Sequence, residues 1–275
     1  MMFHVEQVSR RMDYHLHTVH SFDGVQSVDE LCREMIARGV EEICLTEHLE
    51  PNHPDPEVNV PPIWDVYFRE IENARRAYPL LTIRAGVEIG YEPASRCSVL
   101  RDLNEYPFDF YLLSLHLVGG VDCYDAERFY AGKTRAGAYR EYAEAKAESV
   151  MAFEDYDAVA HIGYVSRYAP WSDSRPLRYE DAPDVFDAML RHMVEHGKCL
   201  EINTSTLETM GCTLPHESII RRYIALGGEM FTFGSDAHDT QSDYRGIERT
   251  RERVRELGGK YQASFDRRKM KLWRI

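Results

Sequence analysis

The sequence lacks the features that would place the protein in a membrane or outside the cell. No stretch approaches the roughly 18 uninterrupted apolar residues of a membrane span, and residues 1–15 contain no continuous apolar run like that of a secretory signal. The six cysteines lie far apart and never form a C-x-x-C pair, which argues against a zinc ribbon or a disulfide framework. These absences predict a cytoplasmic protein with free thiols and no membrane partner.

Positive charge is also scarce. The chain has 33 Lys and Arg residues against 46 Asp and Glu residues, a formal net charge of −13. Such a surface repels nucleic-acid phosphates, so we expect no nucleic-acid partner. An anionic substrate could bind only where bound metal ions reverse the local field. The basic residues that do cluster lie in 260–275, and we interpret this segment as a closing element docked on acidic helices.

What the sequence does contain indicates one α/β domain over 1–275. The length and the 44% hydrophobic content suit a single globular unit, and no low-complexity segment or short repeat divides it. We expect a core over about 12–257 and a basic closing segment over 258–275. Short apolar runs alternate with longer amphipathic ones. The short runs predict strands at Asp13–His17, Glu42–Thr46, Thr82–Glu88, Phe110–Leu115, Ala158–His161, Cys199–Asn203 and Met230–Phe233.

The first predicted helix has the clearest pattern. Ser27 and Glu30 match a capping box, in which each side chain satisfies a backbone N–H of the first turn. Apolar residues then recur at helical spacing as far as Ile36, and Gly39 suits the left-handed position that ends a helix. The other amphipathic runs predict helices at Ile63–Tyr78, Ala136–Phe153, Ala182–Glu195, His216–Leu226 and Arg245–Leu257.

Polar residues recur at the ends of the predicted strands. Alternating strands and helices imply a parallel sheet, either open or closed into a barrel. In a barrel, side chains from all strands converge at the C-terminal mouth, whereas an open sheet spreads its strand ends along an edge. We therefore predict a barrel. Nearly every predicted strand ends in, or just before, one of His17, Glu47-His48, Glu88, His116, His161, Glu201 and Asp236-Ala237-His238.

Each of these residues alone has an ordinary explanation. The H-x-H motif of 15–17 puts two imidazoles on one strand face, which suits zinc, iron or manganese, but an isolated H-x-H is common by chance. A lone Glu88 could be solvated in a loop, and a lone His116 or His161 could be a satisfied strand-end histidine. Their coincidence needs a common cause, because each unpaired imidazole or carboxylate is costly to bury. Bound cations supply that cause, and we predict a metal site.

In order and spacing, these residues resemble the PHP (polymerase and histidinol phosphatase) family, in particular its stand-alone histidinol-phosphatases. The resemblance runs from about Asp13 to His238. It implies a distorted (β/α)7 barrel, similar to a TIM barrel, with two to three divalent metal ions. The flanking motifs are Asp13-Tyr-His-Leu-His-Thr18, Leu45-Thr-Glu-His48, Glu201-Ile-Asn-Thr-Ser205 and Gly234-Ser-Asp-Ala-His238.

The resemblance also implies which residues hold the metals. Zinc, iron and manganese all accept such mixed imidazole and carboxylate ligands. The implied sets are His15, His17, Glu88 and Asp236 for a first ion; Glu88, His116 and His161 for a second; and Asp23, His48 and His238 for a third.

Such a site is typical of phosphomonoester hydrolysis, and the resemblance makes L-histidinol phosphate the expected substrate. Metal ions lower the pKa of bound water and clamp the oxygens of an in-line displacement, so we expect a metal-bridging hydroxide as the nucleophile. Asp236 and His238 are the candidate proton donors to the leaving group. Glu47 and Ser235 are candidates for orienting the ligands.

Arg167 follows His161 at a place where similar histidinol-phosphatases have an arginine that grips the phosphate. The alternative is an exposed surface arginine. The chain departs from the family at Thr206-Leu207-Glu208, where Gly-Leu-Arg is usual, so an acid stands in the place of a second phosphate-binding arginine. Three explanations remain open: a substitute at Arg175, a substitute at Arg178, or contact of Glu208 with the amine of the substrate.

Three other functions fit parts of the pattern. A PHP phosphatase for another small phosphomonoester, such as a nucleotide or sugar phosphate, would use the same ligands. An amidohydrolase-like C–N hydrolase also uses clustered metals on a barrel, but no predicted strand ends in the lysine that such enzymes carboxylate. A non-enzymatic PHP module would be expected to have lost ligands, whereas every ligand position is filled here.

Overall fold

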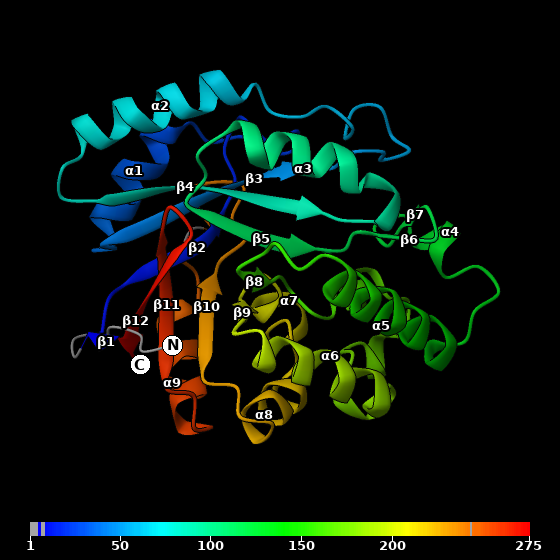
Figure 1. Ribbon diagram of the computed structural model, residues 1–275. Helices are drawn as coiled ribbons and strands as arrows, with labels where there is room; N and C mark the ends of the chain where they lie inside the picture. Colours follow the sequence, from blue (N-terminus) through cyan, green and yellow to red (C-terminus); the bar gives the residue numbers. More distant parts are fainter. Residues whose placement is uncertain (1–4, 7–8, 243) are drawn as a thin grey trace.

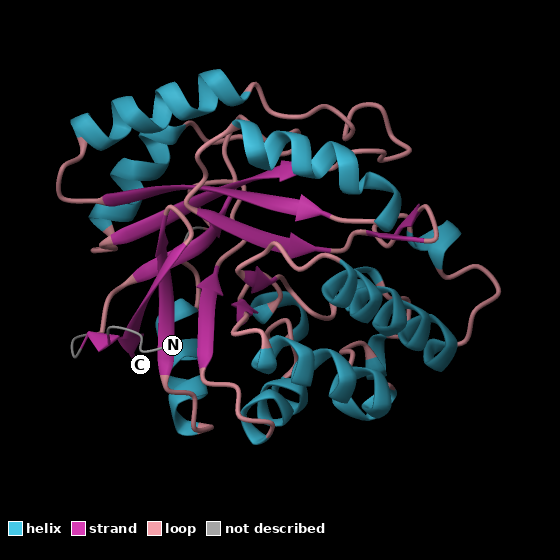
Figure 2. Ribbon diagram, viewed as in Figure 1, coloured by secondary structure: helices cyan, strands magenta, loops and turns pink. Residues whose placement is uncertain are grey.

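The computed structural model describes residues 5–6, 9–242 and 244–275, and a single large sheet dominates them (Figures 1 and 2). The hydrogen-bonded order is β1-β12-β11-β10-β9-β8-β5-β4-β3-β2. Neighbouring strands are parallel except β11 and β12, as predicted for alternating strands and helices. The strands are β1 (Val5–Glu6), β2 (Met12–Leu16), β3 (Glu42–Leu49), β4 (Thr82–Gly90), β5 (Phe110–Ser114), β8 (Ala158–Val159), β9 (Cys199–Asn203), β10 (Met230–Gly234), β11 (Tyr261–Asp266) and β12 (Lys269–Arg274).

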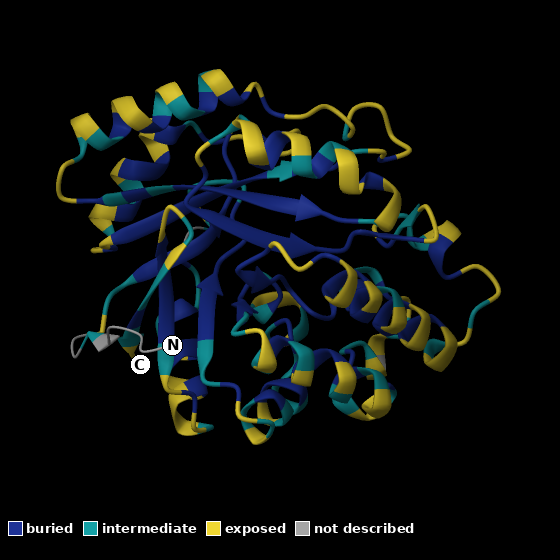
Figure 3. Ribbon diagram, viewed as in Figure 1, coloured by how far each residue is buried: buried dark blue, intermediate teal, exposed yellow. Residues whose placement is uncertain are grey.

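The helices pack around the sheet with their apolar sides toward it, so the strands are buried while the helices expose only their outer sides (Figure 3). The predicted capping box is confirmed at the start of the first helix, where the side chains of Ser27 and Glu30 satisfy each other's backbone N–H. The helices are α1 (Val28–Ala37), α2 (Trp64–Ala77), α3 (Arg96–Glu105), α4 (Ala126–Phe129), α5 (Arg135–Ala152), α6 (Pro183–Glu195), α7 (Leu207–Met210), α8 (Glu217–Ala225) and α9 (Ile247–Glu256).

Several elements were not predicted. Helix α3 was missed because its only buried residues are Val99, Asp102 and Leu103, too few apolar positions to form a clear helical pattern. The two-residue strands β6 (Leu117–Val118) and β7 (Val121–Asp122) form a small separate hairpin that is too short to leave a periodic pattern. The end of this hairpin and α4 line the cavity that is described below.

The closing segment is not docked on helices, and this prediction was wrong. Residues 261–274 form β11 and β12, an antiparallel pair that adds to the sheet beside β10. Four consecutive residues of β11, from Gln262 to Phe265, are buried, which places this strand in the interior. The basic side chains contact acids of loops instead: the guanidinium of Arg268 pairs with Asp155 and Asp157 just before β8.

The predicted closed barrel is also not seen as a closed hydrogen-bonded sheet, because the ladder has two ends, β1 and β2. The β2 end does meet the segment that follows β10. Leu16 and Ala237 form an isolated parallel bridge, and two backbone hydrogen bonds accompany it: His17 N donates to Ala237 O at 2.9 Å and Asp236 N to His15 O at 2.9 Å. The strands thus curve far enough to bring the two sides of the sheet together at this point.

A small apolar cluster fills the inner face of the curved sheet. It contains Tyr14, Phe110 and Phe265, whose rings contact one another, together with residues from five other strands. The hydroxyl of Tyr14 donates to Glu42 at 2.6 Å and accepts from the backbone of Phe265 at 2.8 Å. This plug closes one end of the interior and leaves the carboxyl ends of the strands open to solvent. None of the described helices is long and apolar enough to cross a bilayer.

Candidate metal centre

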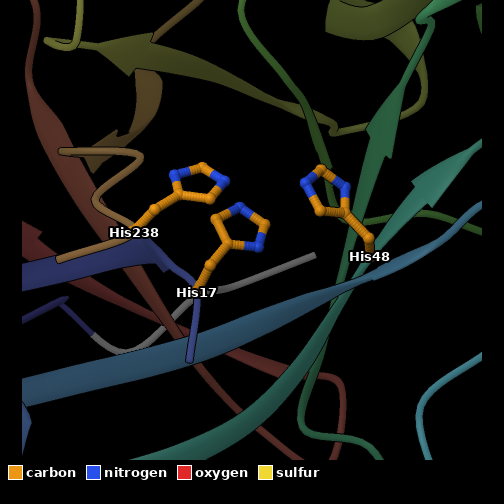
Figure 4. A group of neighbouring side chains, drawn as sticks. All are labelled: His17, His48 and His238. Carbon is orange, nitrogen blue, oxygen red and sulfur yellow. The ribbon is translucent and has the colours of Figure 1, made fainter. Parts of the chain in front are cut away.

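The structure brings all nine predicted ligands to one end of the sheet. Each lies in, or soon after, the C-terminal end of a strand, and Asp23 lies in the loop between β2 and α1. Figure 4 shows the imidazoles of His17, His48 and His238 around a common space. The ring of His17 has its centroid 4.3 Å from that of His48 and 4.2 Å from that of His238. Every group of described side chains that is close enough to share an ion is drawn from these nine residues.

Glu88 lies at the centre of the cluster and is almost wholly buried. Its Oε1 is 2.7 Å from His161 Nε2 and 3.4 Å from His116 Nε2. Its Oε2 has no hydrogen-bond partner among the described residues, although ring nitrogens surround it. These nitrogens are His15 Nε2 at 3.3 Å, His17 Nε2 at 3.4 Å and His48 Nδ1 at 3.0 Å.

Four atoms of the cluster are spaced like the ligands of one ion. They are the Nε2 atoms of His15 and His17, Glu88 Oε2 and Asp236 Oδ1. Five separations among them are 3.1, 3.3, 3.4, 3.4 and 3.5 Å. Four ligands placed tetrahedrally at the ~2.0–2.1 Å distances of zinc sites lie about 3.3 Å apart. The donor set therefore fits a four-coordinate divalent cation.

The ring orientations also suit metal binding. His15 Nδ1 lies 2.5 Å from Glu201 Oε1, and His116 Nδ1 lies 2.6 Å from Glu50 Oε1. A carboxylate only accepts hydrogen bonds, so both Nδ1 atoms carry a proton and each Nε2 is left to face the centre. Carboxylates behind the rings in this way orient histidine ligands and make them more basic.

His17 is held by a relay instead of a direct carboxylate. Its Nδ1 is 3.0 Å from Ser21 Oγ, which in turn donates to Glu47 Oε2 at 2.6 Å. Glu47 thus holds the imidazole of His17, a predicted ligand, through Ser21. Ser235 does not, because its Oγ has no hydrogen-bond partner within the described part of the chain.

Protons balance the carboxylates when no metal ion is bound. Burial opposes protonation of His116, but Glu50 and Glu88 outweigh it and raise its pKa to about 10. His15 behaves alike: against burial, Glu201, Asp236 and Glu88 hold its pKa well above the usual value. Burial, together with the neighbouring His238 and His48, lowers the pKa of His17 to about 3. Cations would replace these protons in a loaded site.

Arg167 lies at the edge of the cluster, in the short 3-10 helix Tyr164–Tyr168. Its Nη2 atom donates to Asp236 Oδ2 and to Ser205 Oγ, both at 2.6 Å. Asp236 Oδ2 also accepts from Asn203 at 3.3 Å. Arg167 is therefore not an exposed surface arginine: it is fixed beside the metal cluster, and its buried Nε has no hydrogen-bond partner among the described residues.

The cluster opens into a cavity of ≈ 1270 Å³. The loop after β3 and the segment from β7 to α4 form its outer wall, and they are joined by His53 Nε2, which donates to Asp122 Oδ2 at 3.1 Å. Among the described lining residues, Arg128 and Arg167 are the only lysines or arginines. Away from the cluster, the wall is aromatic and acidic: Phe22, Tyr124, Tyr164, Tyr168, Asp55, Glu57, Asp122, Asp125 and Glu127.

The three explanations for the Glu208 departure find no support in the geometry. Glu208 does not line the cavity, and its carboxylate pairs at the surface with Arg245 Nη1 at 2.7 Å. Arg175 donates to the backbone oxygens of Ser166 and Arg167, so it supports the Arg167 segment instead of facing the cavity. Arg178 is not a lining residue either.

Sequence reasoning missed Glu50, whose Oε1 lies 2.6 Å from His116 Nδ1 and 3.4 Å from His48 Nδ1. Against burial, His116 and His48 lower the pKa of this carboxyl to about 2. One available indication was Gly90 at the end of β4. A Cβ there would lie 1.8 Å from Glu50 Oε2, so only glycine leaves room for the carboxylate. Gly234 does the same for His15, whose Cβ would be 2.3 Å away.

Comparisons with known proteins agree with this geometry. The model of the PHP domain family matches residues 13–205. A histidinol-phosphatase of Lactococcus lactis is 30% identical over 259 residues, 93% of this chain and 94% of the relative. A probable histidinol-phosphatase of Clostridium acetobutylicum is 31% identical over 82% of this chain and 86% of the relative.

A solved structure resembles the whole fold. It is the histidinol phosphate phosphatase of Lactococcus lactis complexed with zinc, L-histidinol and phosphate, with a TM-score of 0.88, 29% identity, and coverage of 95% of this chain and 98% of that one. Together with the family model, these relatives show that the chain belongs to the histidinol-phosphatases of the PHP domain family.

Proposed function

We propose that the protein hydrolyses L-histidinol phosphate to L-histidinol and phosphate at a centre of two or three divalent metal ions. The observation that carries this proposal is the Glu88 carboxylate, which meets five imidazoles at the floor of a cavity edged by Arg167. The relative of known structure was solved with L-histidinol and phosphate, and the proposal carries that chemistry to this chain.

We also propose that the curved sheet is a distorted (β/α)7 barrel, with the Leu16–Ala237 bridge as its closure. Without closure, the ligands of β2 and those that follow β10 would lie far apart along an open sheet. The five separations near 3.3 Å among His15, His17, Glu88 and Asp236 support the barrel, because they require β2 to meet the segment after β10.

Different residues of the site have different roles in the proposed reaction. Bound divalent ions would lower the pKa of a water molecule and neutralise the phosphoryl oxygens. Glu201, Glu50 and the Ser21–Glu47 relay hold the imidazoles in place. Asp236 is the weaker candidate for the proton donor, because Arg167 and Asn203 donate to its Oδ2 and hold it as an acceptor. His238 remains the other candidate and faces the cavity.

The direct test is an assay with purified protein. We expect phosphate release from L-histidinol phosphate, its loss after treatment with a chelator, and its return on adding zinc or manganese. Nucleoside monophosphates and sugar phosphates in the same assay test the alternative substrates. Release of phosphate from none of these esters would refute a phosphatase function.

Arg167 provides a first prediction. Arg167→Ala should lower kcat/KM for the phosphorylated substrate by about 100-fold, roughly the loss of one charge-assisted bidentate contact to a phosphoryl group. Metal content, measured by mass spectrometry, should stay unchanged, because the guanidinium bonds the oxygen of Asp236 that points away from His15 and His17. Arg245→Ala, which removes an arginine outside the cavity, serves as the control. Equal kinetics in the two variants would remove Arg167 from the site.

The outer wall favours a substrate with a cationic organic part. Glu57 and Glu127 are exposed carboxylates in the cavity wall, and no basic residue of the described lining except Arg128 balances them there. An ammonium or imidazolium group is attracted to such a wall, whereas a second phosphate is repelled. Histidinol phosphate carries the former and not the latter.

A double variant tests this selectivity. Replacing Glu57 and Glu127 by Gln should raise KM for L-histidinol phosphate by about three- to tenfold, as expected for partly screened charges, and leave kcat unchanged. Replacing Glu144 and Glu148 by Gln removes the same charge from the exposed side of α5. The two doubles are compared on L-histidinol phosphate and on a neutral phosphomonoester. If both shift KM equally, net charge and not the wall is responsible.

A further inference from the structure

Lys146 is a fully buried lysine in α5 that the proposed reaction leaves without a role. Its Nζ donates to the backbone oxygen of Leu113 at 3.1 Å, and among the described residues this is its only hydrogen-bond partner. An ammonium has three N–H groups, so two remain unsatisfied in the interior. Burial accordingly lowers the pKa of Lys146 to about 7, with Glu88 and Glu201 acting in the opposite direction.

Stability does not explain a lysine at this position. Burying an ammonium with a single acceptor is costly, and an unbranched apolar side chain of similar length, such as Met, would fill the same volume without that cost. Lys198 offers a contrast at the opposite end of the sheet, where its Nζ donates to two carbonyls, those of Glu154 and Tyr156, at 2.7 and 2.6 Å. The poorly satisfied Lys146 therefore points to a use other than packing.

The oxygen that accepts from Lys146 belongs to Leu113, at the place where β5 meets the segment after β8, and the residues on both sides of this place contact Glu88. Leu113 O also accepts from Ala160 N at 2.9 Å, which joins β5 to the segment after β8. The residue after Leu113 is Ser114, whose Oγ donates to Glu88 Oε1 at 2.5 Å. The residue after Ala160 is His161, whose Nε2 is 2.7 Å from the same oxygen.

We propose that Lys146 is a positioning residue for the metal centre: its buried amine clamps the β5–β8 junction so that Ser114 and His161 converge on Glu88 Oε1. The inference rests on the proposed function, since it concerns the ions that this function needs. Lys146 touches neither the ligands nor the substrate, and it acts through Leu113, Ser114 and His161.

Lys146→Met tests the proposal. The metal-free variant should unfold at the same temperature as the wild type or at a higher one, because an unfavourable burial is removed. Its affinity for zinc, measured by competition with a chromophoric chelator, should fall by about 10- to 100-fold, the range found when groups behind metal ligands are lost. With zinc in excess, kcat should fall while KM for L-histidinol phosphate changes less than about twofold.

Lys198→Met is the matched control, and it should lower stability without changing zinc affinity. If Lys146→Met does not fold, Lys146→Leu, which also removes the amine, replaces it in the same titration. Wild-type zinc affinity in the folded variant, or a loss of stability alone, would overturn the proposal. Zinc affinity is measured without substrate, so the outcome is separate from whether the protein hydrolyses histidinol phosphate.

Discussion

Glu88→Gln is expected to abolish phosphatase activity, with a loss of at least about 1000-fold in kcat/KM. The substitution keeps the shape of the side chain and removes the charge that faces five imidazoles. A metal ion contributes several kcal/mol to a transition state of this kind, and about 4 kcal/mol corresponds to a 1000-fold change in rate. Metal analysis of the purified variant should show the loss of at least one ion per chain, because Glu88 is shared between the predicted sets.

Glu42→Gln is the control for this experiment. Glu42 is a buried carboxylate in the neighbouring strand β3, but it lies at the opposite end of the sheet and bonds Tyr14, Arg10 and Arg84. Its replacement should lower thermal stability and leave the metal content and kcat intact. Full metal content and activity in Glu88→Gln would contradict the central position of Glu88.

Zinc affinity is expected to rise steeply with pH. Against burial, nearby carboxylates raise the pKa of His15 and His48 well above the usual value and that of His116 to about 10, so all three rings are protonated at neutral pH in the metal-free protein. An ion that binds these nitrogens must displace the protons, and each displaced proton changes the apparent affinity about tenfold per pH unit. An ion that displaces two of them should bind about 100-fold more weakly for each unit that the pH falls.

The stability of the metal-free protein is expected to change with pH in the opposite direction to its zinc affinity. The folded-state pKa of His116 lies above its unfolded value, so the stability it contributes is present below about pH 6.5 and is lost as the pH rises toward 10. Thermal unfolding with and without zinc should therefore diverge as the pH increases. Calorimetric titration in two buffers with different ionisation enthalpies counts the released protons. Identical heats in both buffers would show that no proton is displaced.

The sequence was sufficient to predict the strands and to identify the nine residues that the fold gathers at one end of the sheet, because both leave local patterns. All seven predicted strands exist in the sheet, with ends that differ by at most three residues. The largest difference is at β3, which continues to Leu49 and does not end at Thr46, while β8 ends two residues before the predicted His161. Polar residues at strand ends identified the cluster because parallel strands carry such ends to one side.

The groups behind the ligands could not be predicted in the same way. Glu50 is one of 46 acidic residues, and only its contact with His116 distinguishes it. Lys146 lies within the predicted helix α5, and a lysine in a helix is ordinarily exposed, so the sequence does not indicate its burial. The closing hairpin of 261–274 was misread because the prediction counted its basic residues and gave no weight to the apolar residues between them, such as Met270 and Leu272. Such features depend on which distant segments meet, and a single sequence does not contain that information locally.

The bridge between Leu16 and Ala237 has a consequence for how the site comes into being. His15 and Asp236 lie far apart in the sequence, and their side chains meet only once β2 has paired with the segment that follows β10. An ion held by both segments would add cross-links at a place where the backbone supplies a single bridge, and it would therefore stabilise the closure of the sheet. Without an ion, the contact between Leu16 and Ala237 is the part of the curved sheet that we expect to separate first.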